Sequence, residues 1–176
     1  MKVLIIGAGA WGTALAVNAA TQGRHAIGLW ARHAAQQQAM LATRSNAAYL
    51  PGVSLPASLA LSTGDVRAAS ADQDLLVLAG PVAAARGLLT ELAALRKPVA
   101  WLSKGFELPQ PGAQEQGLMV HEIQAEVAPQ LHCGVLSGPS FAREVALGQP
   151  TALVAASHHE EVRQALVEAF HGPTLR

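Results

Sequence analysis

Short apolar runs alternate with longer, often alanine-rich stretches along the whole chain. The runs have the length of buried strands, and the stretches between them have the length of helices. Strands are predicted at residues 2–6, 25–30, 59–62, 74–79, 99–103, 133–137 and 151–155, and helices at residues 13–22, 34–42, 82–95, 114–127, 141–147 and 159–170. This alternation is typical of a doubly wound α/β fold, in which helices cover both faces of a mostly parallel sheet.

The breaks in this pattern are short. Pro81 stands where the first residue of a helix belongs, and the least regular stretch, residues 43–57, contains two prolines and a glycine and is predicted to be a loop. No internal repeat, low-complexity tract or flexible linker interrupts the alternation. We therefore expect residues 1–176 to form one domain.

Composition narrows the function classes. Hydrophobic residues make up 51% of the chain and charged residues 14%, and the twelve Lys and Arg residues balance twelve Asp and Glu residues. Because no run of basic residues forms an electrostatic track, nucleic-acid binding is not expected. No uninterrupted apolar run reaches the roughly 18 residues of a membrane-spanning helix, so no membrane span is predicted.

The chain is expected to be cytoplasmic. Its first 20 residues have the hydropathy of a secretory signal, but Gly7, Gly9 and Gly12 would break a signal helix. The single cysteine, Cys133, leaves no intramolecular disulfide to form, which agrees with a reducing compartment. Cys133 lies in an apolar run and is predicted to be an inert core residue rather than a nucleophile.

The most informative segment is the junction KVLIIGAGAWGT at residues 2–13. An apolar strand leads directly into Gly7-x-Gly9-x-x-Gly12 and then into a predicted helix, which is the context that a dinucleotide-binding motif requires. Gly7 permits the tight turn, Gly9 lets the backbone approach a diphosphate, and Gly12 lets the helix pack against the sheet. The helix would also direct free N–H groups at the phosphates. We therefore predict a dinucleotide site here.

The end of the second predicted strand bears on cofactor choice. An acidic residue about 20 positions beyond the glycines binds the ribose 2′-hydroxyl of NAD, whereas an arginine suits the 2′-phosphate of NADP. Arg32 and His33 occupy this place, and no Asp or Glu occurs before Asp65. NADP(H) is therefore favoured. NAD(H), or the use of both cofactors with a solvated Arg32, stays open.

Two further segments follow predicted strands, where open α/β sheets bind ligands. Lys104 leaves the strand at residues 99–103 beside Gly105, so its ammonium group could reach a crevice at the sheet edge. Gly138, Pro139 and Ser140 lead from another strand into a helix, and the free N–H groups of this segment could bind a phosphate or a carboxamide. The alternatives are a solvated loop lysine and an ordinary serine N-cap.

Five motifs together resemble the bacterial NAD(P)-dependent glycerol-3-phosphate dehydrogenases. They are GAGAWGTA at residues 7–14, LWAR at 29–32, NAAYLP at 46–51, SKGFE at 103–107 and SGPSFAREV at 137–145. The resemblance implies reversible hydride transfer between the nicotinamide and dihydroxyacetone phosphate, which gives sn-glycerol 3-phosphate for phospholipid synthesis. It implies that Lys104, Gly138 and Ser140 contact this small-molecule substrate. It further implies a cofactor site formed by Ala10, Trp11, Arg32, His33, Tyr49, Lys104 and Ala142.

The resemblance also implies a missing half. The family is about twice this long, and its second, all-helical domain carries the general acid-base lysine and the residues that clamp the phosphate. We therefore expect this chain to be a truncated Rossmann-type cofactor domain that contains no catalytic residue, binds dinucleotide and turns over little or nothing. A homodimer stays open.

Other interpretations remain. The chain could be a free-standing dinucleotide-binding module, or part of another two-domain reductase such as ketopantoate reductase or 6-phosphogluconate dehydrogenase. No metal site is predicted, because the only cluster with suitable residue types, residues 158–161 (HHEE), fits a solvated helix start.

Overall fold

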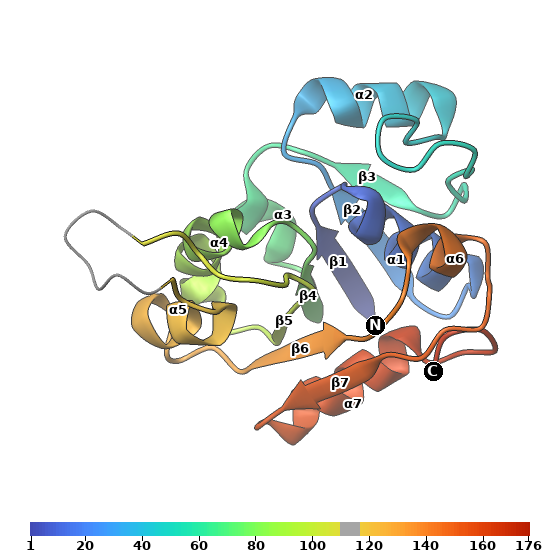
Figure 1. Ribbon diagram of the computed structural model, residues 1–176. Helices are drawn as coiled ribbons and strands as arrows, with labels where there is room; N and C mark the ends of the chain where they lie inside the picture. The colour runs from blue at the N-terminus through green and yellow to red at the C-terminus, as the bar shows by residue number, and fades with distance from the viewer. Residues whose placement is uncertain (110–116) are drawn as a thin grey trace.

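Seven strands form one sheet in the computed structural model, which describes residues 1–109 and 117–176. The strands lie in the order β3-β2-β1-β4-β5-β6-β7 (Figure 1). All neighbours are parallel except β7, which runs antiparallel to β6. The strands are β1 Lys2–Ile6, β2 Ala26–Trp30, β3 Ala60–Ser62, β4 Leu75–Leu78, β5 Val99–Trp101, β6 Cys133–Ser137 and β7 Val154–Ser157. The chain moves outward from β1 to β3 and then crosses back to β4, so the strand order reverses between β1 and β4.

The helices cover both faces of this sheet (Figure 1). Helices α1, α6 and α7 pack on one face, and α3, α4 and α5 pack on the other. The helices are α1 Ala10–Thr21, α2 Ala34–Thr43, α3 Val66–Ser70, α4 Ala85–Leu92, α5 Val120–Val127, α6 Ala142–Ala146 and α7 Glu160–Phe170, with short 3-10 turns at Val82–Ala84 and Ala93–Leu95. The doubly wound, mostly parallel fold expected from the sequence is confirmed.

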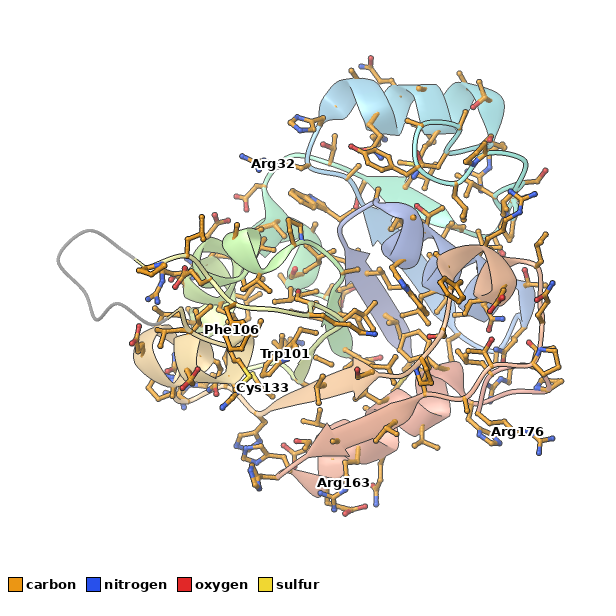
Figure 2. The ribbon with its side chains drawn as sticks, in the orientation of Figure 1. Arg32, Trp101, Phe106, Cys133, Arg163 and Arg176 are labelled. Carbon is orange, nitrogen blue, oxygen red and sulfur yellow. The ribbon has the colours of Figure 1, made fainter. Side chains whose placement is uncertain are left out.

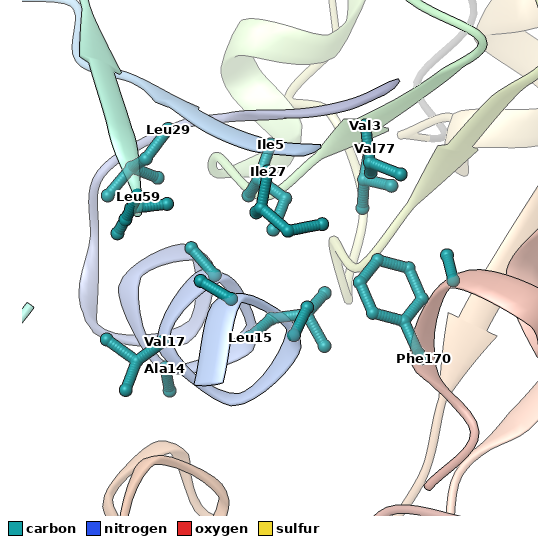
Figure 3. Packing of buried hydrophobic residues seen from close by; sticks show 14 of the residues in the cluster. Val3, Ile5, Ala14, Leu15, Val17, Ile27, Leu29, Leu59, Val77 and Phe170 are labelled. Atoms are coloured by element: carbon teal, nitrogen blue, oxygen red, sulfur yellow. The ribbon is translucent and has the colours of Figure 1, made fainter. Parts of the chain in front are cut away.

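The apolar run of β1 is continuous because both faces of this strand are buried. Val3 and Ile5 belong to the core cluster on the α1 side, whereas Leu4 and Ile6 belong to the cluster on the α4 side. Figure 3 shows the first cluster, in which Phe170 of α7 packs beside the strands. Because successive side chains of a strand point to opposite faces, a sheet covered on both faces needs apolar residues at every position. Each fully buried aliphatic side chain stabilises the fold by about 1.5–3 kcal/mol.

Several predicted boundaries differ from those observed. The helix predicted at residues 13–22 begins earlier, at Ala10, because the end of the glycine-rich segment is itself helical. The helix predicted at 114–127 begins at Val120; residues 117–119 are not helical, and 114–116 lie outside the described residues. Helix α3 was not predicted because it has only five residues; the Asp65 carboxylate caps it by accepting from the N–H groups of Arg67 and Ala68.

The last predicted strand, at residues 151–155, is placed wrongly. Strand β7 begins at Val154 and pairs antiparallel with β6, while Thr151 instead forms an isolated parallel bridge with Leu175. An apolar run indicates extended backbone, but it contains no information on which segment becomes its partner. None of the helices within residues 1–109 and 117–176 is long and apolar enough to cross a membrane.

A buried ion pair fixes the segment that follows β5. Glu107 is 6% exposed. Arg86 of α4 donates to its carboxylate from Nε at 3.0 Å and from Nη2 at 2.7 Å, and Nη2 also lies 2.9 Å from Glu126 of α5. These carboxylates, Glu107 first, raise the pKa of Arg86 above its ordinary value. The pair therefore ties residues 103–107 to two helices.

Cys133 opens β6 and is half-buried (Figure 2), and it packs against the core cluster that contains Trp101. Burial raises the pKa of its thiol from 9.0 to about 12, because a thiolate loses its hydration there. At any pH well below 12 the thiol stays protonated and is a weak nucleophile.

The substitution Glu107→Gln should destabilise the fold. The neutral amide leaves part of the Arg86 charge without its buried partner, so the free energy of unfolding should fall by about 1–3 kcal/mol. Urea denaturation measures the change. Glu91→Gln, at an exposed position on the same helix as Arg86, is the matched control and should leave the midpoint unchanged. Equal midpoints for both variants would show that the Arg86–Glu107 pair contributes nothing.

Cys133 should resist alkylation in the folded protein. At pH 8.5 a thiol whose pKa is about 12 holds very little thiolate. Iodoacetamide should therefore react at least about a hundredfold more slowly than with the same protein unfolded in urea, where the pKa returns to its ordinary range. Mass spectrometry over time measures both rates. Similar rates would mean that the thiol is not desolvated.

Candidate functional site

Two of the three motif glycines are required by the fold itself. Gly7 has a φ of +121°, and a Cβ there would lie 3.0 Å from the backbone of Ala79 and of Gly80. A Cβ on Gly12 would lie 1.9 Å from the carbonyl oxygen of Gly7. The N–H of Gly7 donates to the carbonyl of Trp30 at 2.9 Å, which ties the turn to β2. Because Gly7 and Gly12 carry no side chain, α1 can lie close to the ends of β1 and β4.

Gly9 differs from the other two. A Cβ at this position would meet no atom of the chain within 4 Å. Gly9 is the N-cap of α1, whose first N–H groups have no partner within the helix. The packing of the described residues therefore does not require a glycine here, whereas a ligand that approaches the backbone would.

The cleft beside Gly9 lies where the carboxyl ends of β1, β4, β5 and β6 meet. It has a volume of about 400 Å³. Its lining comprises Gly9, Ala10, Trp11, Ala79, Gly80, Pro81, Leu102, Ser103, Lys104, Leu136, Ser137, Gly138, Ser140 and Leu153. Lys104 is the only titratable side chain among these residues. An apolar cleft with few polar groups at the reversal of strand order is typical of a ligand site in this kind of fold.

Lys104 spans two of the strand ends. Its Nζ donates to the carbonyl oxygen of Gly138 at 3.0 Å, and so connects the end of β5 to the turn that follows β6. Next to it, the hydroxyl of Ser103 donates to the carbonyl of Gly80 at 2.7 Å. The Ser140 hydroxyl lies 3.5 Å from the same Gly138 carbonyl. Lys104 and the turn that contains Gly138 and Ser140 thus line one cleft.

The fold brings half of the predicted site residues together at this cleft. Gly9, Ala10, Trp11, Lys104, Gly138 and Ser140 line it, and Gly7 and Gly12 shape the turn beneath it. Arg32, His33, Tyr49 and Ala142 do not line it.

The predicted residues outside the cleft occupy three places. Arg32 and His33 are exposed and follow β2; Arg32 is labelled in Figure 2. The last residue of β2 is Trp30, whose carbonyl accepts the hydrogen bond from the N–H of Gly7. Tyr49 is 53% exposed on the loop between α2 and β3. Ala142 is the first residue of α6 and packs against the core.

Part of the cleft wall could not be recognised from motifs in the sequence. Ala79, Leu102 and Leu153 line the cleft, although no ligand-binding motif marks them. Their place in the sequence could have identified two of them. Ala79 and Leu102 each directly follow a buried strand, at the carboxyl edge of the sheet. Leu153 is brought in by the pairing of β7, which the sequence did not predict.

The loop predicted at residues 43–57 is largely irregular, with one bridge between Ser45 and Ser54. Asn46 is 2% exposed, and its Nδ2 donates to the carbonyl of Ala8 at 2.9 Å and to the hydroxyl of Thr13 at 2.7 Å. Arg143 of α6 donates to the carbonyl of Pro51 at 3.0 Å. The loop is thereby connected to both the glycine turn and α6.

The histidine-rich segment at residues 158–161 is the start of α7, with His159 as its N-cap. The His159 ring stacks on His132 with a centroid separation of 3.9 Å, and His132 pairs with Glu161. Within the part of the chain that the structure describes, no group of three or more His, Cys, Asp or Glu residues is arranged to hold a metal ion.

Comparison with known proteins gives one consistent result. The family model for the N-terminus of NAD-dependent glycerol-3-phosphate dehydrogenase matches residues 2–163. The glycerol-3-phosphate dehydrogenase [NAD(P)+] of Polaromonas naphthalenivorans is 59% identical over 191 residues, covering 100% of this chain and 54% of that protein. Its counterpart in an Acidovorax species is 55% identical over 177 residues, covering 100% of this chain and 52% of that protein.

The fold agrees with these relatives. The crystal structure of glycerol-3-phosphate dehydrogenase from Coxiella burnetii superposes with a TM-score of 0.86 at 32% identity, covering 99% of this chain and 52% of that one. The chain spans about half the length of the curated relatives it matches. The motifs at the cleft, the family match and the superposition agree, and the chain belongs to the NAD-dependent glycerol-3-phosphate dehydrogenase family, of which it represents the N-terminal part.

Proposed function

We propose that this chain is the dinucleotide-binding domain of an NAD(P)-dependent glycerol-3-phosphate dehydrogenase. The observation that carries the proposal is the bare backbone of Gly9 at the mouth of an apolar cleft that also contains Lys104. The substrate proposed from the names of the relatives is glycerol 3-phosphate, with dihydroxyacetone phosphate as its oxidised form.

The cleft fits a nicotinamide dinucleotide. An added side chain at Gly9 would occupy open space beside the cleft, and the first turn of α1 presents free N–H groups there. Gly9, Ala10 and Trp11 would therefore hold the diphosphate, and the remaining apolar wall would receive the nicotinamide. When bound, this cofactor supplies or accepts the hydride.

Lys104, Gly138 and Ser140 would bind the phosphorylated substrate. An ammonium group attracts a phosphate dianion, and the turn after β6 offers N–H groups that can donate to its oxygen atoms. The Lys104–Gly138 contact holds the lysine at this edge of the cleft. Ala142 and Tyr49 would contribute to the cofactor site from its periphery.

The chain by itself would bind without efficient turnover. Reduction of a ketone leaves an oxyanion that needs a proton donor in place. Lys104 is the only titratable side chain that lines the cleft among the described residues, and we assign it to binding. The proton donor and the phosphate clamp would then belong to the half of the enzyme that the longer relatives have and this chain does not span.

We propose NADP(H) as the preferred cofactor and the cytoplasm as the place of reaction. Arg32 follows β2 with its side chain exposed, where a 2′-phosphate could pair with it, and no carboxylate occurs nearby in the sequence to bind a 2′-hydroxyl. The single free thiol of Cys133 suits a reducing compartment.

Titration distinguishes the two cofactors. Wild-type protein should bind NADPH more tightly than NADH, followed through the fluorescence of Trp11 in the cleft wall. The substitution Arg32→Ala should weaken NADPH roughly ten- to hundredfold, the range of a charge-assisted contact, and NADH by less than about twofold. The charge-matched control is Arg176→Ala, because Arg176 lies at the opposite end of the molecule from Arg32 in Figure 2. Equal losses for both cofactors would show that Arg32 does not recognise the 2′-phosphate.

Substrate choice is tested on the protein encoded by the complete reading frame. We expect NADPH oxidation with dihydroxyacetone phosphate, at a rate at least about a hundredfold above that of the 176-residue chain alone, because proton transfer contributes about 10²–10⁴-fold. The comparison substrates are ketopantoate, which is assayed with NADPH, and 6-phosphogluconate, which is assayed with NADP+. Activity only with those two would overturn the assignment. Binding of dinucleotide without activity toward any of the three substrates would favour a free-standing module.

A further inference from the structure

Two side-chain amides converge on one carbonyl oxygen inside the glycine turn. Gln36, on α2, donates from Nε2 to the carbonyl of Ala8 at 2.6 Å. Asn46, on the following loop, donates to the same oxygen at 2.9 Å and to the Thr13 hydroxyl at 2.7 Å. The Asn46 oxygen in turn lies 3.5 Å from Gln36 Nε2. The Ala8 carbonyl is therefore held from two elements that are distant in sequence.

Holding this carbonyl also sets the direction of the next N–H group. The peptide bond between Ala8 and Gly9 is trans, so its C=O and N–H point to opposite sides. Because Gln36 and Asn46 fix the oxygen on their own side, the Gly9 N–H points away from them. Among the described residues no group accepts a hydrogen bond from that N–H, and Gly9 itself lines the cleft.

We propose that Gln36 and Asn46 are positioning residues for the diphosphate of the dinucleotide, an inference that rests on the proposed function. Neither residue is among those that line the cleft. They orient the Ala8–Gly9 peptide so that its N–H is already directed at the ligand before binding. A donor fixed in advance loses less entropy on binding than one that must first be ordered.

Gln36→Ala is the main test because Gln36 is only half-buried and its loss leaves Asn46 in place. NADPH and NADH should both bind about three- to tenfold more weakly, as expected for one neutral hydrogen bond. Adenosine 2′-monophosphate, which lacks the diphosphate, should compete with unchanged affinity. The matched control is Gln37→Ala, the next residue of α2, whose amide donates instead to Leu61 at 3.3 Å. It should leave all three affinities unchanged.

A spectroscopic readout separates orientation from general loosening. In the ligand-free protein, the carbonyl ¹³C resonance of Ala8 and the amide resonance of Gly9 should move in Gln36→Ala and stay in place in Gln37→Ala. Asn46→Ala should shift both resonances in the same sense and weaken NADPH further. If Asn46→Ala fails to fold, Gln36→Ala carries the test alone.

The outcomes are distinct. If the wild-type protein binds neither NADPH nor NADH, the proposed function is overturned. Binding by the wild type with equal affinities for Gln36→Ala and Gln37→Ala would overturn the positioning role alone. A parallel loss of adenosine 2′-monophosphate and NADPH in Gln36→Ala would also overturn it, because it would show a general structural role.

Discussion

The whole arrangement depends on the close approach of α1 to the ends of β1 and β4. At Gly12 a side chain would overlap the carbonyl oxygen of Gly7, with only 1.9 Å between the added Cβ and that oxygen. The helix axis would therefore have to move outward if any other residue stood here, and the first turn of α1 would move with it. This turn begins at Gly9 and Ala10, which line the cleft. One backbone contact thus determines both the packing of the sheet and the place of the site.

The parallel sheet converts this contact into a cleft. Because β1, β4, β5 and β6 all end at one edge, the loops that follow them face a common space at the point where the strand order reverses. Polar contacts then hold these loops in place. The Arg86–Glu107 pair fixes the segment after β5, and the Lys104–Gly138 hydrogen bond joins it to the turn after β6. The apolar core supplies the general stability, while a few charged and amide groups fix the walls of the cleft.

The cleft is built for binding. Its wall is apolar apart from backbone groups, three serine hydroxyls, the indole N–H of Trp11 and one lysine. Such a wall can exclude water from a nicotinamide ring and hold a phosphate, but it offers no pair of groups for proton transfer. This agrees with a family in which the relatives are about twice as long as this chain. It also explains how a stable fold and a substantial cleft can be present in a domain that is proposed to turn over little by itself.

The sequence by itself determined the parallel sheet, the glycine turn and the segments that contribute Lys104, Gly138 and Ser140. These features depend on local pattern: continuous apolar strands, glycines at fixed spacing, and small or polar residues directly after a strand. Only the tertiary structure decided the direction of β7, the burial of Glu107, and the convergence of Gln36 and Asn46 on Ala8. Those amides lie 28 and 38 residues from their acceptor. A local pattern does not specify which distant carbonyl an amide will reach, because that choice is made only when the elements pack together.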